Sequence, residues 1–285
     1  MNLASPIVHH PFNFGVGGFN FTGFGIAVLL AFLIAQIVAE RELARRGHDV
    51  EAAAVSDVLF AALLGTIIGA KLYYVTIVTH DWHDLWSRGG FVFWGGFMGS
   101  VALCALTIRF KHLSFVRFAD VAGIAIAAGY AVGRTGCWAV GDDYGKPYSG
   151  PLAVAFPQGA PPSTVAEMQR TFHVQFPPGT DPQSVVSVYP TQLLEVVLGL
   201  VMFGVLWRMR DHDHAEGWLF GVWCIFAGIE RFIVEFFRAK DDRFTWLGGL
   251  STAQAIAIGI VVVGVAVMMA TRRQQTTAEG RPLKA

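Results

Sequence analysis

Two arginines interrupt apolar stretches of the sequence, and their chemistry suits an anion. Arg134 lies between Gly133 and Gly136, which leave open space beside its side chain. Arg231 is followed four residues later by Glu235, and residues four apart share one face of a helix and can pair. A guanidinium group presents a planar fork of N–H donors that matches the oxygens of a phosphate. The pattern predicts a site that binds a phosphate group.

Other polar side chains also lie within apolar stretches. Lys71 is far from either end of its stretch, and Gln192 and Glu195 lie one turn apart in another. Ionisable groups at such positions are costly in a membrane and usually functional. Structural roles remain open for each: Lys71 can extend to an interface, and Glu195 with Gln192 can join two helices. Glu230, Arg231 and Glu235 can likewise form an ion-pair network that locks helices together.

Seven apolar stretches must position these side chains. Of the 285 residues 54% are hydrophobic and only 15% are charged, against roughly 25% charged in soluble domains. A membrane-spanning helix needs about 20 apolar residues, and backbone groups in lipid must be paired within the segment. We therefore predict an all-α integral membrane protein with about seven transmembrane helices, at 21–39, 58–78, 91–108, 118–138, 191–207, 218–237 and 250–270. Gly65 and Gly69 have the four-residue spacing that allows two helices to approach closely.

The distribution of positive charge orients these helices. Basic residues favour cytoplasmic loops, and 12 of the 21 lysines and arginines follow the first, third, fifth and seventh stretches, against six on the other side. This bias predicts a periplasmic N-terminus and a cytoplasmic C-terminus. It also places the loop 139–189, which holds eight of the 12 prolines, in the periplasm. We predict that this loop folds into a small head on a transmembrane domain of residues 1–270, and that the tail 271–285 is disordered.

Several other features are less informative. The N-terminal arm 1–20 carries His9 and His10 and is rich in Phe and Gly, so it could lie on the membrane surface or be unstructured. No basic segment precedes the first stretch, so we do not expect a cleaved signal peptide. The three cysteines form no metal-binding spacing, and we predict neither a metal nor a cofactor. Acidic and basic residues balance at 21 each, and no nucleic-acid partner is predicted.

The order of the motifs resembles that of the prolipoprotein diacylglyceryl transferase family. The segments that carry the resemblance are 133–137 (Gly-Arg-Thr-Gly-Cys) through 141–145 (Gly-Asp-Asp-Tyr-Gly), 189–195 (Tyr-Pro-Thr-Gln-Leu-Leu-Glu) and 231–238 (Arg-Phe-Ile-Val-Glu-Phe-Phe-Arg). Supporting matches are 95–99 (Gly-Gly-Phe-Met-Gly), 69–71 (Gly-Ala-Lys) and Asp120. They occur in the family's order and span most of the chain. The family's seven-helix layout, with the N-terminus outside, agrees with the charge distribution.

The resemblance implies a reaction in the bacterial inner membrane. Family members move the diacylglyceryl group of phosphatidylglycerol to the lipobox cysteine of a prolipoprotein, which forms a thioether and releases glycerol phosphate. It implies catalytic roles for Arg134, Arg231, Glu235 and Asp142. Arg134 and Arg231 correspond to the family's two phosphate-handling arginines, which we expect to meet around one lipid phosphate. Glu235 corresponds to the acid that orients the second arginine. We assign substrate binding to Gly145, Lys71, Gln192, Glu195, Trp94 and Cys137.

Several positions depart from the family pattern. Trp94 stands where many members have His, a proposed base, and indole does not serve as a proton acceptor. Cys137 replaces an Asn, and Lys71 replaces an arginine, which keeps the charge but loses the fork. Phe24, Leu194 and Ala227 each replace a tyrosine. The candidates for a replacement base are Asp142, Asp143, Glu235 and water.

These departures keep two alternatives open. The chain could be a family paralogue that acts on a different acceptor or headgroup, because the arginines and Glu235 remain while other polar groups are lost. It could also be a non-enzymatic phospholipid-binding membrane protein. A transporter would often show repeated halves with matching broken helices, and the sequence shows no internal repeat.

Overall fold

A computed structural model of the chain describes residues 7–16, 19–87, 89–239, 245–246 and 249–271. The chain forms two compact units, one of Met1–Ala35 with Gly123–Ala285 and one of Gln36–Ala122. Helices α1 (Gly23–Arg45) and α4 (Phe115–Val140) each contribute residues to both units. The predicted disorder of the tail 271–285 falls, apart from Thr271, outside the described residues.

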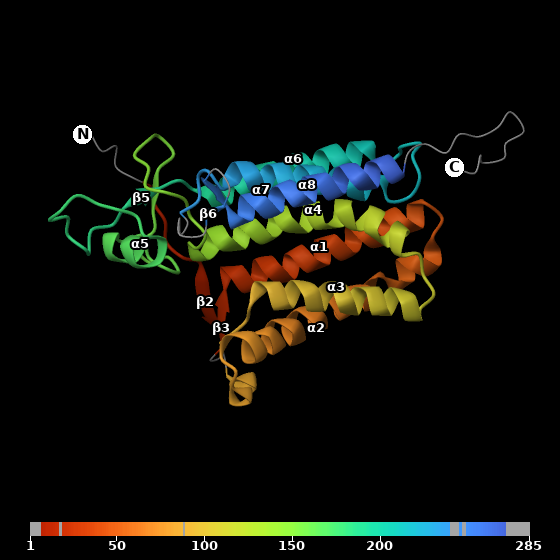
Figure 1. Ribbon diagram of the computed structural model, residues 1–285, viewed down its shortest axis with the longest axis horizontal. Coiled ribbons are helices and arrows are strands. Elements are labelled where there is room, and N and C mark those ends of the chain that lie inside the picture. Colours follow the sequence, from red (N-terminus) through yellow and green to blue (C-terminus); the bar gives the residue numbers. More distant parts are fainter. Residues whose placement is uncertain (1–6, 17–18, 88, 240–244, 247–248, 272–285) are drawn as a thin grey trace, which may run out of the picture. The chain divides into compact units, whose positions relative to one another are not determined.

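Each of the seven predicted membrane stretches coincides with a helix (Figure 1). Besides α1 and α4 these are α2 (Asp49–Tyr73), α3 (Phe93–Phe110), α6 (Thr191–Met209), α7 (Trp218–Val234) and α8 (Thr252–Ala270). Within the described residues, six of the seven are long and apolar enough to cross a membrane. The exception, α7, has 17 residues. The expected all-α membrane architecture is therefore confirmed, and the protein is a multi-pass membrane protein.

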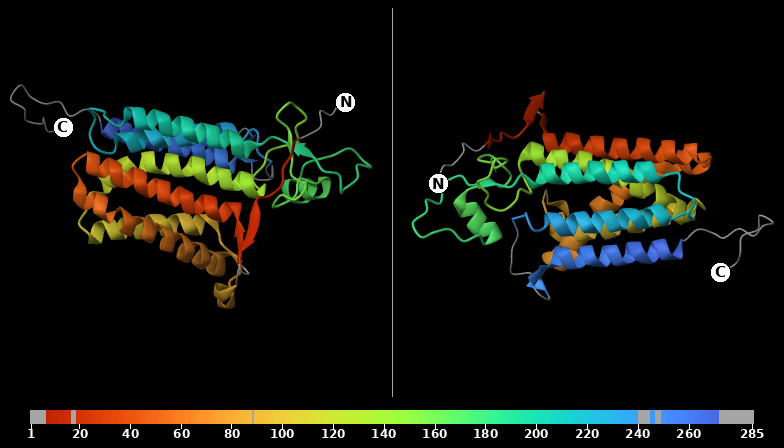
Figure 2. Two further views of the ribbon diagram at one scale, coloured as in Figure 1. Left: turned by 180° about the vertical axis from the view of Figure 1, so that it is seen from behind. Right: turned by 90° about the horizontal axis from the view of Figure 1, so that it is seen from above.

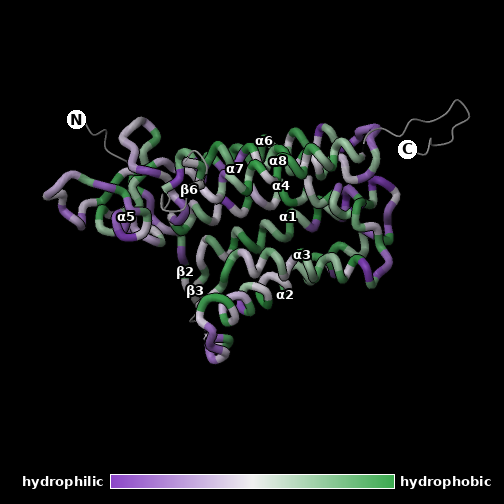
Figure 3. The backbone as a smooth tube through the Cα atoms, in the orientation of Figure 1, coloured by the Kyte–Doolittle hydropathy of each residue, from purple (hydrophilic) through white to green (hydrophobic). Residues whose placement is uncertain are grey.

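The first unit contains a bundle in which helix backbones approach closely at small residues. Gly129 of α4 faces Ala31 of α1, and Gly199 of α6 packs on the ring of Tyr130. Helices α6, α7 and α8 run side by side in both views of the bundle (Figures 1 and 2). Large apolar side chains on the outer faces of the helices are exposed, among them Leu29 and Val262, each at 61%. Such exposed apolar faces suit a hydrocarbon environment, and polar residues gather instead at the helix ends and in the loops (Figure 3).

The long segment between α4 and α6 is a folded lobe with its own core. Its elements are β4 (Val154–Ala155), α5 (Val165–Phe172) and β5 (Ser187–Val188). Phe156 and Met168 have no exposed surface, and Tyr144 stacks on Phe156 with ring centroids 5.4 Å apart. Ser163 is also fully buried, and its hydroxyl donates to the carbonyl of Val186. Burial of these aromatic and polar groups explains how a proline-rich segment folds.

The N-terminal segment joins this lobe to the bundle. Strand β1 (Ile7–Val8) runs parallel to β4, which gives a three-stranded sheet of order β1-β4-β5. Strands β2 (Asn13–Val16) and β3 (Phe19–Thr22) form an antiparallel hairpin that leads into α1. Phe12 lies between β1 and β2, and its backbone N–H donates to the carbonyl of Ala139 at the end of α4. The carbonyl of Phe12 accepts from the N–H of Gly23, the first residue of α1. The alternative that the arm 1–20 is unstructured was therefore wrong for its described residues, 7–16 and 19–20.

The second unit is dominated by a hairpin of α2 and α3. The backbones meet where Gly65 and Gly69 of α2 face Gly95 and Gly99 of α3, and a Cβ on any of these glycines would collide with a carbonyl oxygen opposite. The predicted close approach at Gly65 and Gly69 is confirmed. Beyond α2 the chain continues through the π-helical turn η1 (Tyr74–Val78) and the 3-10 helix η2 (Trp82–Trp86).

A buried charge cluster lies at the other end of this unit. Glu42 and Asp120 are 1% and 0% exposed, and Arg46 donates to both carboxylates at 2.8 Å. A buried carboxylate needs such a partner, because an unpaired buried charge is very costly. The sequence match at Asp120 therefore corresponds to an ion pair within this unit.

Candidate functional site

Three of the motif segments converge at one end of the bundle in the first unit. Arg134 lies in the last two turns of α4, Glu195 lies in the second turn of α6, and Arg238 follows the end of α7. The C-terminal ends of α4 and α7 lie at the same end of the bundle as the start of α6, so residues far apart in sequence meet there. The lobe that carries α5 adjoins this end (Figure 1).

Arg134 is almost enclosed by acceptors. Its Nη1 donates to Asp143 Oδ2 at 2.9 Å and to the Cys137 sulfur at 3.3 Å. Its Nη2 pairs with Glu195, which is 2% exposed. Only 13% of the Arg134 side chain is exposed, and its Nε is buried without a hydrogen-bond partner in the described structure. The Nε–H of this guanidinium therefore remains unused.

Arg238 is the second guanidinium of this cluster. Its Nη2 donates to Asp143 Oδ1 at 2.7 Å, and its Nη1 lies 3.7 Å from Glu195 Oε1. Two arginines and two carboxylates thus form a ring of alternating charge. Burial alone would raise the pKa of Asp143, but the positive charges of Arg238 and Arg134 outweigh it, and the pKa lies below its usual value. Asp143 therefore stays ionised at neutral pH.

The turn after α4 is built to present this carboxylate. Gly141 ends the helix with a φ of +70°, and the N–H groups of Gly141 and Asp142 both donate to the Cys137 carbonyl. Asp143 has a φ of 56°, a conformation that Asp tolerates better than most residues. The first turn of α6 holds the same segment, because Thr191 Oγ1 donates to the Asp143 carbonyl at 2.7 Å. Gln192 Nε2 donates to the Asp142 carbonyl in the same way.

Gly145 is the point where the three motif segments touch. Its N–H donates to the Tyr189 carbonyl at 2.8 Å, and it forms a bridge with Arg238. A Cβ at this position would lie 2.7 Å from Tyr189 Cβ and 2.9 Å from Thr191 Cγ2, and it would also collide with the Phe237 carbonyl. A glycine is therefore required for the segments to meet. Substrate contact by Gly145 stays a prediction.

Arg231 and Glu235 form the ion pair that their spacing predicts. Arg231 Nη2 lies 2.9 Å from Glu235 Oε2, although the geometry is not that of an aligned hydrogen bond. The Arg231 side chain is 34% exposed, whereas that of Glu235 is 5% exposed. Among the described residues, the ion pair of Arg231 is with Glu235, and its side chain is more exposed than that of Arg134.

Tyr130 and Glu230 extend the polar cluster into the bundle. The Tyr130 hydroxyl donates to Glu230 Oε1 at 3.0 Å and also lies 3.4 Å from Glu195 Oε1. Arg134 and Arg231 both interact electrostatically with the buried Glu230. Glu230 therefore lies within electrostatic range of both arginines, and contact of the two arginines with a common phosphate stays a prediction.

Cys137, Asp142 and Asp143 could hold a metal ion by position, with ligand atoms within 4.8 Å of one another. Arg134 donates to two of the three, however, and supplies the positive charge that a metal would bring. Asp142 differs from Asp143 because its Oδ1 is buried without a partner in the described structure. Burial raises the pKa of Asp142 above its usual value.

Lys71 and Trp94 belong to the second unit. The Lys71 ammonium donates to Ser87 at its carbonyl (2.7 Å) and hydroxyl (2.9 Å) and to the Gly89 carbonyl at 2.6 Å. These contacts hold the segment between α2 and α3. Trp94 is 45% exposed and packs against Phe93 and Phe97 of its own helix. Substrate binding by Lys71 and Trp94 stays a prediction.

Comparison with known proteins places this arrangement in a family. The family model described as prolipoprotein diacylglyceryl transferase matches residues 11–270. The chain belongs to this family. Three curated relatives carry the name phosphatidylglycerol–prolipoprotein diacylglyceryl transferase. That of Stenotrophomonas maltophilia is 29% identical over 96% of this chain and 96% of its own. That of Geobacter sulfurreducens is 27% identical over 93% and 96%, and that of Bordetella avium is 27% identical over 89% and 91%.

Two members of the cluster, Arg238 and Tyr130, were not predicted from the sequence. Arg238 closes the motif 231–238 but lies beyond the end of α7, so helical spacing from Arg231 does not place it in the cluster. Tyr130 precedes Arg134 by four residues, and the same spacing rule could have singled it out. Helical spacing was therefore a signal for Tyr130, whereas the position of Arg238 depends on the fold.

Proposed function

We propose that this protein transfers the diacylglyceryl group of phosphatidylglycerol to the lipobox cysteine of a prolipoprotein, in the bacterial inner membrane. The observation that carries the proposal is the buried cluster of guanidinium groups at the end of apolar helices. A phosphate that reaches this depth in a membrane belongs to a lipid headgroup. Membership of the transferase family supports the same reaction.

The reaction replaces one bond to a glyceryl carbon with another. The thiol loses its proton, because the thiolate is the nucleophile. The sulfur then forms a bond to the glyceryl carbon while the carbon–oxygen bond to the phosphate breaks. The leaving glycerol phosphate keeps the electron pair and gathers negative charge. Preorganised cations stabilise such charge most effectively in a site that excludes water.

The three arginines have different roles in binding the phosphate. Arg231 is one-third exposed and receives the incoming phosphate, while Glu235 fixes the orientation of its guanidinium. Arg134 is held by Glu195 and Asp143, and its unused Nε–H is available to donate to a phosphate oxygen. Arg238 keeps the carboxylates of this ring in place and so positions Arg134.

Asp142 takes the role of proton acceptor that Trp94 cannot fill. Its carboxylate adjoins Cys137 and retains an unpartnered, buried oxygen. A raised pKa makes a carboxylate a stronger base toward a thiol than it is in water, since proton transfer follows basicity. The proton passes from the incoming thiol to Asp142 and leaves through solvent after the glycerol phosphate departs.

The membrane arrangement is part of the proposal. All seven long helices cross the membrane, α7 included, with the N-terminus in the periplasm and the C-terminus in the cytoplasm. The lobe between α4 and α6 is then a periplasmic head, beside the site where a translocated lipobox would arrive. The distribution of positive charge along the sequence supports this orientation.

An assay with phosphatidylglycerol and a lipobox peptide tests the reaction. The purified protein should form the thioether product, and Arg134→Ala should reduce its rate by at least 100-fold. Arg170→Ala serves as a matched control, because Arg170 is 76% exposed in the lobe and should not affect the rate. A folded wild-type protein that yields no thioether would defeat the proposal.

A second candidate is a family paralogue that uses another acceptor or headgroup. The observation that favours it is the loss of polar groups at Phe24, Trp94 and Leu194, where the family usually has Tyr or His. Complementation of a strain depleted of its own transferase separates the two. Growth supports transfer to prolipoproteins, whereas lack of growth with the protein correctly inserted supports the paralogue.

A further inference from the structure

Glu230 is a buried carboxyl group that has no role in the proposed reaction. It lies in α7, with 8% of the residue exposed. Arg134 and Arg231 are within electrostatic range of it, but within the described structure both form their ion pairs with other carboxylates. A carboxylate that is buried without a paired cation is very costly. The neutral, protonated form of Glu230 avoids this cost.

The hydroxyl group of Tyr130 faces two carboxyl groups but carries one hydrogen. Its oxygen lies 3.0 Å from Glu230 Oε1 and 3.4 Å from Glu195 Oε1. With both glutamates ionised, one of these contacts would bring two oxygens together without a hydrogen between them. A proton on one glutamate removes the conflict, because that carboxyl group donates to the phenol oxygen and the phenol donates to the other glutamate. The two contacts therefore require two hydrogens.

Glu195 is the glutamate better suited to carry the negative charge. It accepts from Arg134 Nη2, and its Oε1 lies 3.7 Å from Arg238 Nη1. Positive charges so close to a carboxyl group favour its ionised form. Glu230 has no such pair among the described residues, so the second hydrogen belongs on Glu230. The chain of donors then runs from Glu230 through Tyr130 to Glu195.

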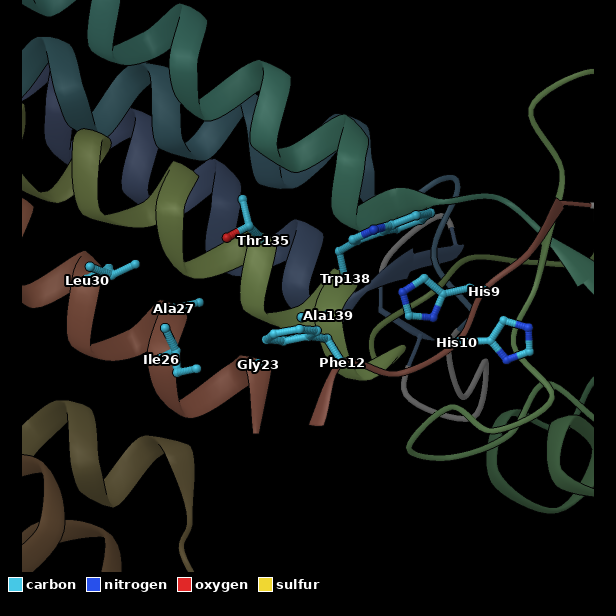
Figure 4. Close-up of a pocket in the computed structure, with 10 residues that line it drawn as sticks. All are labelled: His9, His10, Phe12, Gly23, Ile26, Ala27, Leu30, Thr135, Trp138 and Ala139. Carbon is cyan, nitrogen blue, oxygen red and sulfur yellow. The ribbon is translucent and has the colours of Figure 1, made fainter. Parts of the chain in front are cut away.

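The face of α4 that borders α1 brings no further charge to this chain. A cavity lies on that side, between the N-terminal segment, α1 and α4 (Figure 4). Thr135 lines it, directly after Arg134 in the sequence, and none of its lining residues is an Arg, Lys, Asp or Glu. The charged groups that act on Glu230 are those of the cluster, namely Glu195 of α6, Arg134 of α4 and the adjacent Arg231.

We propose that Glu230 is a neutral acid that donates to Tyr130, and that Tyr130 in turn donates to Glu195 and fixes its carboxylate against Arg134. Glu230 and Tyr130 are then positioning residues, because they act on the phosphate site through Glu195. Their effect on the transfer rests on the proposed function, whereas the protonated state of Glu230 does not. An ionised Glu230 would instead compete with Glu195 for the hydrogen of Tyr130.

The protonation state is read from infrared difference spectra of the purified full-length protein at pH 7, without substrate. Protonated and ionised carboxyl groups absorb at different frequencies. The wild-type spectrum minus that of Glu230→Gln should contain the carbonyl band of a protonated carboxyl group, and this band should shift in D2O. Carboxylate bands in that difference would overturn the proposal.

Glu167→Gln is the matched control for the spectra. Glu167 lies in α5 of the lobe and pairs with Arg170 at 2.8 Å. Hydrogen bonds from Thr171 and Arg170 hold the pKa of Glu167 below its usual value, so it is ionised at pH 7. The wild-type spectrum minus that of Glu167→Gln should therefore contain carboxylate bands.

Tyr130→Phe tests the first hydrogen bond of the chain. The variant keeps the aromatic ring but removes the phenol oxygen that accepts from Glu230. The band assigned to Glu230 should remain in this variant and should shift, because its hydroxyl group has lost the acceptor. An unchanged band position would show that Glu230 does not donate to Tyr130, and would contradict the chain.

The positioning role is tested in the thioether assay with two replacements of similar size at Glu230. Glu230→Gln retains an N–H donor and should keep most of the activity. Glu230→Met fills the space without a donor, and it should lose about tenfold in kcat/KM, the effect of one hydrogen bond. Tyr130→Phe should lose a similar factor. Equal activities of the Gln and Met variants would contradict the positioning role, because a residue that only fills space would tolerate both.

Failure of this inference can be told apart from failure of the proposed reaction. If the wild type makes no thioether but the difference spectra identify a protonated Glu230 bonded to Tyr130, the reaction is wrong and the hydrogen-bonded chain stands. If thioether forms and Glu230 is ionised, the reaction stands and the inference about Glu230 is wrong.

Discussion

Replacement of Gly145 with alanine tests how the site is assembled. The added Cβ would lie 2.7 Å from Tyr189 Cβ and 2.9 Å from Thr191 Cγ2. Carbon atoms pack favourably at about 3.5–4.0 Å, so the neighbouring backbone must move by roughly 0.7 Å or more. The Phe237 carbonyl blocks the third side, and Arg238 follows it directly. The displacement therefore reaches the guanidinium that holds Asp143 and Glu195.

The expected effect on catalysis is larger than that on stability. Overpacking of this kind costs about 1–3 kcal/mol, which a membrane protein with a bundle of long helices should survive. A misplacement of about 1 Å in a catalytic arrangement can reduce the rate about 100-fold. We therefore expect Gly145→Ala to fold, to unfold at a somewhat lower temperature, and to lose about two orders of magnitude in kcat/KM.

The assay is the thioether-forming reaction, with thermal unfolding followed in parallel. Gly204→Ala is the matched control, because Gly204 lies in α6 and nothing is within 4 Å of its Cβ position. That variant should keep both activity and stability. Activity of Gly145→Ala within twofold of the wild type would show that the three segments do not depend on close approach at this residue. That result would contradict the role of Gly145 in positioning Arg238.

Three further predictions concern charged groups. Lys71→Met leaves carbonyls of the following segment unpaired and should lower the free energy of unfolding by about 2 kcal/mol. Its control, Lys111→Met, breaks a half-exposed ion pair and should lower that free energy by about 1 kcal/mol or less. Equal losses in the two variants would contradict the prediction. Because the pKa of Asp143 is lowered by folding, its stabilising effect is present above its usual pKa of about 3.9 and is lost as pH falls through the lower folded value. Asp143→Asn should therefore lose less thermal stability than the wild type between pH 7 and pH 3, and parallel curves would refute the ion pairs. Arg238→Lys cannot span two carboxylates with a fork and should reduce activity about tenfold, while Arg170→Lys should have no effect.

Features that depend on local spacing could be predicted from the amino-acid sequence. Each predicted apolar stretch became a helix, because paired backbone groups and an apolar surface are properties of a segment alone. Arg231 and Glu235 pair across one helical turn as their spacing requires. The close approach of α2 and α3 at Gly65 and Gly69 follows from residues that lack side chains.

Tertiary structure alone decided which groups share the site. Arg134 and Arg238 are more than 100 residues apart, and they meet only because α4 and α7 end at the same level of the bundle. Gly145 must be a glycine because Tyr189, Thr191 and the Phe237 carbonyl lie against its Cα. Spacing along the sequence does not reveal these neighbours. From the sequence, the segment that carries His9 could be either a surface arm or an unstructured tail. In the structure His9 is held by strand pairing with residues more than 140 positions away. Contacts between distant segments depend on how whole helices and strands pack, and a local pattern of residues does not encode that packing.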